Sequence, residues 1–156
     1  MLRLLAAMAT ALVLFVGLLL APTTAPAVAG KGASSATKYG NAAHKATNSI
    51  RAKHDAVELG MDGCLRQQAL EQANAMATSG DLSHQSMSAV AAKCKMGYVG
   101  ENVAYGFRNG RSVVKGWMKS PGHRENLLSP NFRVMGIGAV KRDGVWWVAQ
   151  VFGRRP

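Results

Sequence analysis

Three side chains that can bind a metal or transfer a proton stand beside glycine, serine or proline, where a chain usually turns or an element ends. They are His84, Glu101 and His123. Two imidazoles and one carboxylate match an open zinc site in which water takes the fourth position. Their spacing is irregular, unlike that of two histidines held four residues apart on one helix. The residue types therefore indicate a candidate site, but local spacing does not predict that the three converge.

The polar neighbours of these residues have simpler roles open to them. Glu101 and Asn102 can bond backbone amides and hold the glycine-rich segment 97–110, and this alternative to a site role stays open. Ser120 lies three residues before His123. Because neither a nucleophile elbow nor an aspartate partner accompanies it, we do not expect a serine hydrolase.

Helical periodicity predicts the elements that carry the candidate residues. Small and apolar side chains recur at helical spacing, and glycine, proline or a capping serine marks the ends of each run. The predicted helices cover residues 41–59 (ended by Gly60), 65–77 (ended by Gly80), 87–93 (followed by Cys94) and 113–120 (capped by Ser112 and closed by Pro121).

The C-terminal stretch changes to the pattern of β-strands. Residues 134–140 and 145–152 are rich in β-branched and aromatic side chains, and Asp143-Gly144 between them supplies the positive φ angles of a tight turn. The second strand is apolar on both faces, so helices must cover both sides of the sheet. The predicted fold is α+β, a three-layer α/β/α sandwich around a small antiparallel sheet that ends in a C-terminal hairpin.

The N-terminal residues predict export. Arg3 precedes an apolar run over residues 4–20, and Ala27-Val28-Ala29 suits signal peptidase. We predict a signal peptide over residues 1–29, a flexible leader over 30–38 and one domain over 39–156. Cleavage after Ala27 is the second choice, and an uncleaved N-terminal anchor is the alternative. After cleavage we expect a protein without a transmembrane segment, secreted to the outside or held at the cell envelope.

The cysteines fit the same compartment. Cys64 and Cys94 are the two cysteines of the chain, and an even count in an exported protein indicates a disulfide. The bridge would close a loop of 94 − 64 = 30 residues. The alternative is a pair of buried free thiols.

The charge is strongly positive and spread along the chain. There are 19 Lys and Arg against 8 Asp and Glu, a formal net charge of +11. Such a surface keeps a protein soluble, or it attracts anionic envelope polymers or lipid headgroups. No recognition helix or aromatic–basic motif is present, so we expect no nucleic acid partner. We expect a monomer.

An ordered set of motifs resembles one known family. After His84, at the end of a predicted helix, the motifs are GENVA at 100–104, WMKSPGHR at 117–124, NLL at 126–128, Phe132, GIG at 136–138 and QVFG at 150–153. Over residues 41–153 the chain resembles the CAP superfamily of cysteine-rich secretory, antigen 5 and pathogenesis-related 1 proteins, or SCP domain, in its compact bacterial form.

The resemblance implies an α-β-α sandwich, secretion, and a surface cleft lined by two histidines and two glutamates that can hold a divalent metal. Carried over by position, the cleft histidines are His84 and His123 and the first glutamate is Glu101, with Asn102 and Ser120 as supporting residues.

The second glutamate of the family's cleft is missing. Ser120 stands three residues after Trp117, where the longer members have a glutamate, and Glu125 nearby is expected to face solvent. The loss of one carboxylate ligand predicts weaker metal affinity or none.

The leading prediction is therefore a binding module rather than an enzyme. Its cleft would engage a small or lipid-like ligand, an extracellular partner, or a divalent metal such as zinc, and no catalytic residue is assigned. One alternative is a metal-dependent hydrolase in which His84, Glu101 and His123 hold zinc and an activated water. The other is a basic envelope protein that binds anionic polymers. Ser120 in place of a carboxylate speaks against the hydrolase.

Overall fold

The computed structural model describes residues 31–156, with side chains from residue 35 onward. The predicted signal peptide over residues 1–29, its two cleavage sites and the alternative of an uncleaved anchor lie outside the described residues. The elements, in chain order, are α1 (Lys31–Ala52), β1 (Gly60–Met61), α2 (Gly63–Ser79), α3 (Met87–Cys94), β2 (Tyr98–Tyr105), α4 (Gly110–Trp117), α5 (Pro121–Leu128), β3 (Val134–Arg142) and β4 (Val145–Arg154).

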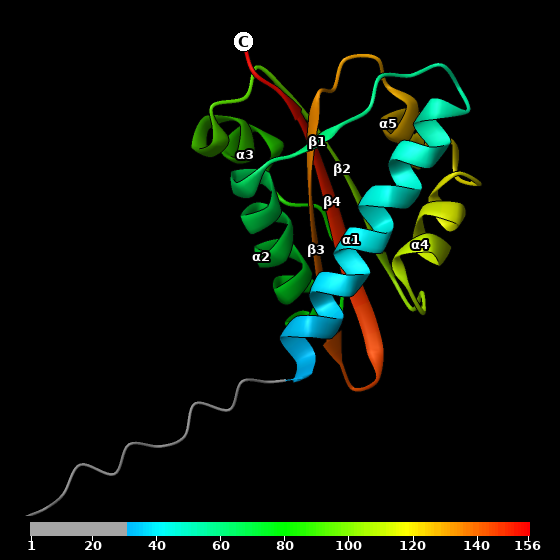
Figure 1. The fold of residues 1–156 in the computed structure, drawn as a ribbon. Helices are drawn as coiled ribbons and strands as arrows, with labels where there is room; N and C mark the ends of the chain where they lie inside the picture. Colours follow the sequence, from blue (N-terminus) through cyan, green and yellow to red (C-terminus); the bar gives the residue numbers. More distant parts are fainter. Residues whose placement is uncertain (1–30) are drawn as a thin grey trace, which may run out of the picture.

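The elements form three layers, as predicted (Figure 1). The sheet has the strand order β1-β3-β4-β2, with helices α2 and α3 on one face and α1, α4 and α5 on the other. The apolar side chains on the two faces of the sheet pack into two separate hydrophobic cores, one on each side. The sheet is mixed rather than purely antiparallel, because the short strand β1 pairs parallel to β3. A chain that enters β1 from α1 and leaves into α2 crosses from one helical layer to the other at this point.

The C-terminal hairpin is confirmed. Strands β3 and β4 pair antiparallel from Val134 opposite Gly153 to Arg142 opposite Val145. The turn residues Asp143 and Gly144 have φ angles of 49° and 80°. These left-handed angles are what the Asp-Gly dipeptide predicted.

Two glycines of β3 allow α2 to approach the sheet closely. A Cβ atom on Gly136 would lie 2.0 Å from the backbone nitrogen of Arg66, and one on Gly138 would lie 2.2 Å from that of Leu70. Because side chains two apart in a strand point to the same face, both glycines open one channel along which α2 packs.

Helix α1 differs from its predicted extent at both ends. Residues 31–38, which we expected to be a flexible leader, form its first turns. Once later turns pack on the sheet, further residues join a helix at little cost, and Ala, Lys and Ser allow this. At the other end α1 stops at Ala52 instead of continuing to Leu59. The Arg51 side chain bonds the Val57 carbonyl at 2.7 Å and so draws the chain back over the helix end.

The segment between α3 and β3 also differs from the prediction. Asn109, rather than Ser112, is the N-cap of α4, and Ser112 returns a bond to the Asn109 backbone as the third helical residue. Pro121 opens helix α5 instead of only closing α4, a position that its fixed φ angle and missing N–H suit. The glycine-rich segment 97–110 contains strand β2, which pairs with β4.

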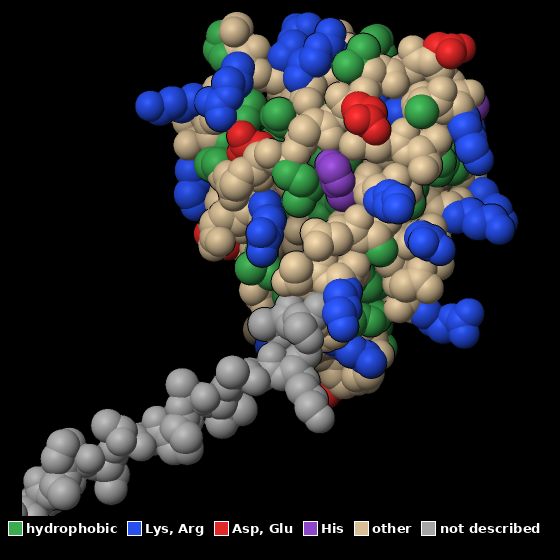
Figure 2. All heavy atoms as spheres, in the orientation of Figure 1, with side chains coloured by type: hydrophobic (Ala, Val, Ile, Leu, Met, Phe, Trp, Pro, Cys, Tyr) green, Lys and Arg blue, Asp and Glu red, His purple; other side chains and the backbone are tan. Residues whose placement is uncertain are grey.

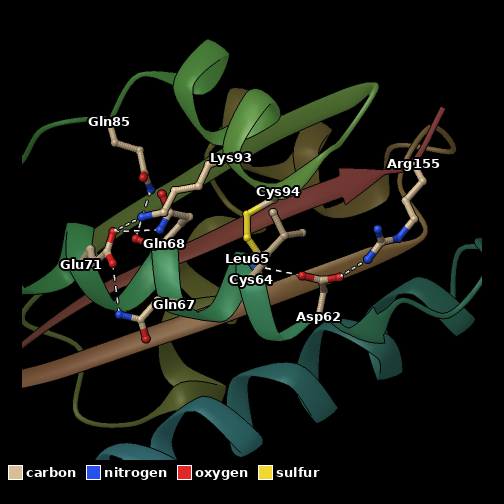
Figure 3. Close-up of a disulfide and its surroundings, with 10 residues drawn as sticks. All are labelled: Asp62, Cys64, Leu65, Gln67, Gln68, Glu71, Gln85, Lys93, Cys94 and Arg155. Carbon is tan, nitrogen blue, oxygen red and sulfur yellow. Dashed lines mark hydrogen bonds and ion pairs between the residues drawn. A yellow bond between two sulfur atoms is a disulfide. The ribbon is translucent and has the colours of Figure 1, made fainter.

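The predicted disulfide between Cys64 and Cys94 is present, with their Cα atoms 5.6 Å apart (Figure 3). It joins the first turn of α2 to the last residue of α3. Next to it Asp62 caps α2 by accepting from the Leu65 amide at 2.9 Å, and its other oxygen lies 3.1 Å from an Arg155 nitrogen. The C-terminus is thereby tied to the start of α2.

Candidate functional site

The structure brings His84 and Glu101 into direct contact. The Nδ1 atom of His84 lies 2.7 Å from Oε2 of Glu101. The Glu101 side chain is 1% exposed, whereas that of His84 is 58% exposed. A carboxylate only accepts hydrogen bonds, so Nδ1 of His84 donates its proton to Glu101 and Nε2 is left for contacts with other groups. The buried carboxylate therefore fixes the orientation of an exposed imidazole.

Both oxygens of Glu101 are occupied. Oε1 accepts from Nε2 of Gln85 at 2.6 Å, and Oε2 also accepts from the Gln85 backbone amide at 3.3 Å. These three bonds within two neighbouring residues satisfy a carboxylate that would otherwise be costly to bury. Glu101 is thus a positioning residue for the loop that carries His84.

Two glutamines of α2, absent from the predicted site, hold the same loop. Nε2 of Gln72 donates to the Ser83 carbonyl at 2.6 Å. Nε2 of Gln85 donates to the Gln68 carbonyl at 3.4 Å, and Figure 3 shows these two residues. Gln68 and Gln72 are buried at the border of the apolar stripe of α2. Polar residues next to an apolar stripe were the available sequence signal, but their partners are too distant along the chain to be identified locally.

His123 is held from the other side of β2. Its Nδ1 lies 2.9 Å from the Ser120 hydroxyl, and its carbonyl accepts from Nδ2 of Asn102 at 3.1 Å. Burial, and to a smaller degree the positive charge of a protonated His84, lower the pKa of His123 from its usual value of 6.5. His123 is therefore neutral at pH 7, and the two imidazoles are near enough to influence each other's charge.

Strand β2 places these groups on its two faces. Successive side chains point to opposite faces, so Glu101 faces α2 and α3 while Asn102 faces α5. Asn126 of α5 donates to the Glu101 carbonyl and to the Asn102 side chain, both at 3.0 Å. The histidine site (His84, Glu101 and His123 with Gln85, Asn102 and Ser120) thus straddles the outer edge of β2.

A buried arginine fixes the far end of α5. The side chain of Arg51, 0% exposed, donates from Nη1 to the carbonyls of Leu127 at 2.8 Å and Ser129 at 3.0 Å. These carbonyls belong to the C-terminal end of the helix, where a positive charge is favourable. Arg51 therefore helps to orient the helix that carries His123, a role that sequence reasoning missed.

As arranged, the histidine site does not offer three converging metal ligands. Among the residues that the structure describes, no group of three His, Cys, Asp or Glu side chains is placed to hold a metal ion. Glu101 directs both oxygens at His84 and Gln85, so the Nε2 atoms of the two histidines are the only ring or carboxylate donors of the predicted three whose partners do not turn them away. Glu125 is exposed, as expected. The donor set does not fit a three-ligand zinc centre in this arrangement, so no chemical step is derived through a metal.

A cavity lies away from the histidine site. Its volume is about 730 Å³, and it is lined by α1, α2 and β3, next to the opposite edge of the sheet. Over residues 31–156, no helix combines the length and apolar character that a membrane crossing requires.

Comparison with known proteins finds one family. The model of the cysteine-rich secretory protein family, CAP, matches residues 44–152. The Bacillus subtilis protein YkwD is 33% identical over 122 residues, which are 72% of this chain and 47% of YkwD. The B. subtilis membrane protein YlbC is 32% identical over 103 residues, 62% of this chain and 30% of YlbC. The chain thus spans less than half the length of either relative.

Solved structures show the same fold. An extracellular protein with an SCP domain from Bacillus anthracis superposes with a TM-score of 0.69 at 27% identity, covering 77% of this chain and 41% of that one. An outer surface protein from Borrelia burgdorferi gives a TM-score of 0.65 at 22% identity, covering 72% of this chain and 90% of that one.

Proposed function

Since this chain belongs to the cysteine-rich secretory protein (CAP) family, we propose that it is an exported binding module whose histidine site contacts a small or lipid-like ligand without chemically changing it. Export is proposed from the N-terminal sequence and from the extracellular or surface descriptions of its structural neighbours. The disulfide suits an oxidising compartment.

The hydrogen bonding of Glu101 carries the preference for binding over turnover. A general base or metal ligand must be able to reach the substrate or metal. Both Glu101 oxygens already accept bonds from His84 and Gln85, and the side chain is 1% exposed. Glu101 therefore serves to position His84 rather than to act on a substrate.

The two imidazoles define what a ligand must offer. His84 presents Nε2 to solvent, where it accepts a hydrogen bond when neutral and donates one when protonated. His123 is partly buried and has a lowered pKa, so it is an acceptor or donor without charge at pH 7. A hydroxyl or an anionic oxygen matches this pair, and both occur in the headgroups of lipids.

The metal-dependent hydrolase is the first alternative, and it needs a rearrangement. Glu101 would have to turn away from His84 and Gln85 to bind the same ion as the Nε2 atoms of the two histidines. Calorimetric titration with zinc chloride tests this. We expect no stoichiometric binding at micromolar zinc, and binding that disappears in His84→Gln and His123→Gln would support the alternative instead.

Charge-driven association with the envelope is the second alternative. Figure 2 shows Lys and Arg side chains scattered over one face with few acidic ones between them. A net charge of +11 attracts anionic surfaces without any specific site. Such binding depends on salt much more strongly than site-specific contacts do.

Sedimentation with lipid vesicles separates the proposal from this alternative. Vesicles of phosphatidylcholine, with and without phosphatidylglycerol, are mixed with the wild type and with the His84→Gln, His123→Gln double variant. Salt is raised from ~0.15 M to ~1 M, which shortens the Debye length from about 8 to about 3 Å. Binding that persists in high salt and is lost in the double variant is expected. Binding that the variant keeps and salt abolishes supports charge-driven association, and no binding in any condition overturns the lipid-like ligand.

A further inference from the structure

The start of α1 lies at the same end of the domain as two turns. The ring centroids of Tyr39 and Trp146 are 4.8 Å apart, and the Tyr39 hydroxyl donates to the Phe107 carbonyl at 3.3 Å. The Gly106 amide donates to the Trp146 carbonyl at 2.9 Å. The β3–β4 turn and the segment between β2 and α4 therefore lie beside the first turns of α1, as Figure 1 shows.

Helix α2 ends at the same place. The two glycines of β3 described above show that α2 and β3 run in the same direction, with Leu70 beside Gly138. From there to Ser79 the helix rises by about 13 Å, and the strand rises equally far by Arg142. The residues that follow α2, up to Leu82, are therefore level with the β3–β4 turn. We call the whole region the hairpin end (residues 35–39, 80–82, 105–111 and 141–146).

Three large apolar side chains of the hairpin end are exposed. Tyr105 is 55% exposed, Leu82 49% and Val145 37%. The Tyr105 ring stacks on Trp147, with their centroids 5.0 Å apart and an angle of 19° between the rings. One face of the Tyr105 ring is thus covered, while most of the side chain stays open. Tyrosine is favoured where proteins meet a membrane interface, because its ring is apolar and its hydroxyl stays hydrated.

Cations surround these apolar side chains. Within the described residues, no cation of the hairpin end belongs to an ion pair. The Lys141 ammonium lies 5.9 Å from the centroid of the Trp146 ring. The acidic residues of this end are Asp81 and Asp143, and its exposed cations are Lys38, Arg108, Arg111, Lys141 and Arg142. A surface that is cationic and apolar together fits an anionic membrane better than it fits a soluble anion.

The opposite end of the domain is also basic, but its cations are partly engaged. Arg155 lies 3.1 Å from a carboxylate oxygen of Asp62. Nη1 of Arg133 donates to the carbonyls of Pro130 and Phe132, both at 2.7 Å. A guanidinium held by protein oxygens is less available to an outside anion, so the hairpin end is the better candidate for a docking surface.

The chain itself leads to the hairpin end. Ten residues, 21–30, separate the apolar run over residues 4–20 from Lys31, where α1 begins. A chain of that length spans at most about 35 Å. While the predicted signal lies in the membrane, during export or as an uncleaved anchor, the start of α1 is held within this distance of the bilayer. The hairpin end is thereby placed where it can contact lipid.

We propose that the hairpin end docks on the surface of a bilayer that contains anionic lipids. Tyr105, Leu82 and Val145 enter the headgroup region, and the surrounding cations contact lipid phosphates. This inference goes beyond the proposed function, because it needs no ligand in the histidine site. It also differs from charge-driven association in general, because one face of the domain makes the contact and apolar side chains take part in it.

Paramagnetic NMR with bicelles maps the contact. The ¹⁵N-labelled chain from Gly30 onward, which holds every described element, is mixed with bicelles of phosphatidylcholine and phosphatidylglycerol that carry a doxyl-labelled lipid. We expect the amide signals of Tyr105, Arg142 and Val145 to lose intensity and those of Lys53 and Arg154, at the opposite end, to keep it.

Three outcomes of this mapping overturn the inference. Loss of intensity centred on His84 and His123 assigns the lipid contact to the histidine site, which supports the proposed function instead. Loss spread evenly over the domain indicates association without a preferred face. No loss at all shows that the domain does not dock on this membrane.

Vesicle sedimentation tests the cations of the hairpin end. Lys141→Gln with Arg142→Gln is expected to weaken binding to phosphatidylglycerol-containing vesicles roughly 25-fold, since one Lys or Arg at an anionic membrane surface contributes a factor of about five. Lys53→Gln with Arg154→Gln is the matched control, because it removes the same charge from exposed positions at the opposite end. Equal losses in the two double variants contradict docking by the hairpin end.

A second pair of variants tests the apolar contact in the same assay. Leu82→Ser with Val145→Ser is expected to weaken binding on the order of 10-fold, because two partly exposed apolar side chains no longer enter the interface. Val57→Ser with Met61→Ser is the matched control, at side chains that are 62% and 43% exposed and lie outside the hairpin end. Binding that the Leu82, Val145 variant keeps in full shows contact by charge alone and contradicts the proposed insertion.

Discussion

Removal of the disulfide between Cys64 and Cys94 is expected to destabilise the domain and to loosen the loop that carries His84. The bridge closes a loop of 30 residues that includes most of α2, the loop and α3. Loop-closure entropy for this length is about 12 cal/mol/K, or roughly 3.5 kcal/mol at 25 °C. A domain of this size is stable by ~5–15 kcal/mol, so the loss is a large share of the total.

The perturbation is the double variant Cys64→Ala, Cys94→Ala, compared with the oxidised wild type by urea denaturation. We expect a loss of roughly 3 to 4 kcal/mol and a fall in Tm on the order of 10 °C. Adding reductant to the double variant is the control, because it removes no bridge and so changes nothing. A loss below about 1 kcal/mol refutes the loop-closure argument.

The same variant tests the connection between the disulfide and the histidine site. The loop is held to α2 by Gln72 and Gln68, but α3, which follows it, is tied to α2 by the bridge. Amide exchange over residues 81–94 is expected to accelerate more than exchange in β3 and β4. Uniform acceleration over the whole domain would show that the bridge stabilises the fold without selectively holding the loop.

Three further changes test the structure around the site. Arg51→Met removes charge-assisted bonds to the Val57, Leu127 and Ser129 carbonyls, and we expect the free energy of unfolding, measured with urea, to fall by roughly 2 to 4 kcal/mol. Arg51→Lys is expected to restore only part of this loss. An unchanged urea midpoint contradicts the role given to Arg51. The pKa of His123 is lowered below 6.5 in the folded state, so the unfolded chain binds the proton at a higher pH and the free energy of unfolding falls as the pH drops through about 6.5. His123→Gln is expected to make that fall shallower in urea denaturation at a series of pH values. Identical pH profiles for the variant and the wild type contradict the pKa shift. Gly138→Ala places a Cβ atom 2.2 Å from the Leu70 nitrogen and is expected to lower the free energy of unfolding by about 1 to 3 kcal/mol or more. Gly122→Ala is the control, because a Cβ atom there meets nothing within 4 Å, and it is expected to be neutral or slightly stabilising. Equal effects of the two variants contradict the close approach of α2.

Sequence signals allowed the hairpin, α2, α3 and the disulfide to be predicted. The elements depend on residues that are neighbours in sequence, such as Asp143-Gly144 at the turn or Gly80 at the end of α2. The disulfide was predicted from the even cysteine count of an exported chain, since Cys64 and Cys94 are 30 residues apart. Strand β2 and helix α5 were not predicted. Glu101 and Asn102 are polar within a strand because their partners, His84 and Asn126, arrive from distant segments. Pro121 indicated only a helix end, although the same residue starts helices well.

The candidate site shows the same division between local and distant information. Residue types and family resemblance predicted His84, Glu101, His123, Asn102 and Ser120, but not which atoms would bond. The supporting roles of the glutamines and of Arg51 were identified only in the structure, because their hydrogen bonds join residues from 6 to 78 positions apart. Metal binding stays a prediction. Ser120 stands where the family has its second glutamate, and Glu101 accepts a bond from Gln85.

The central claim is that His84 and His123 share one site across the edge of β2. The pKa of His123, measured by NMR titration of its ring protons in the wild type and in His84→Gln, tests this directly. Loss of the His84 charge is expected to raise the pKa of His123 part of the way to 6.5, because burial of the ring still lowers it. His54→Gln, at an exposed position after α1, is the control and should leave that pKa unchanged. If His84→Gln also leaves it unchanged, the two histidines do not form a common site.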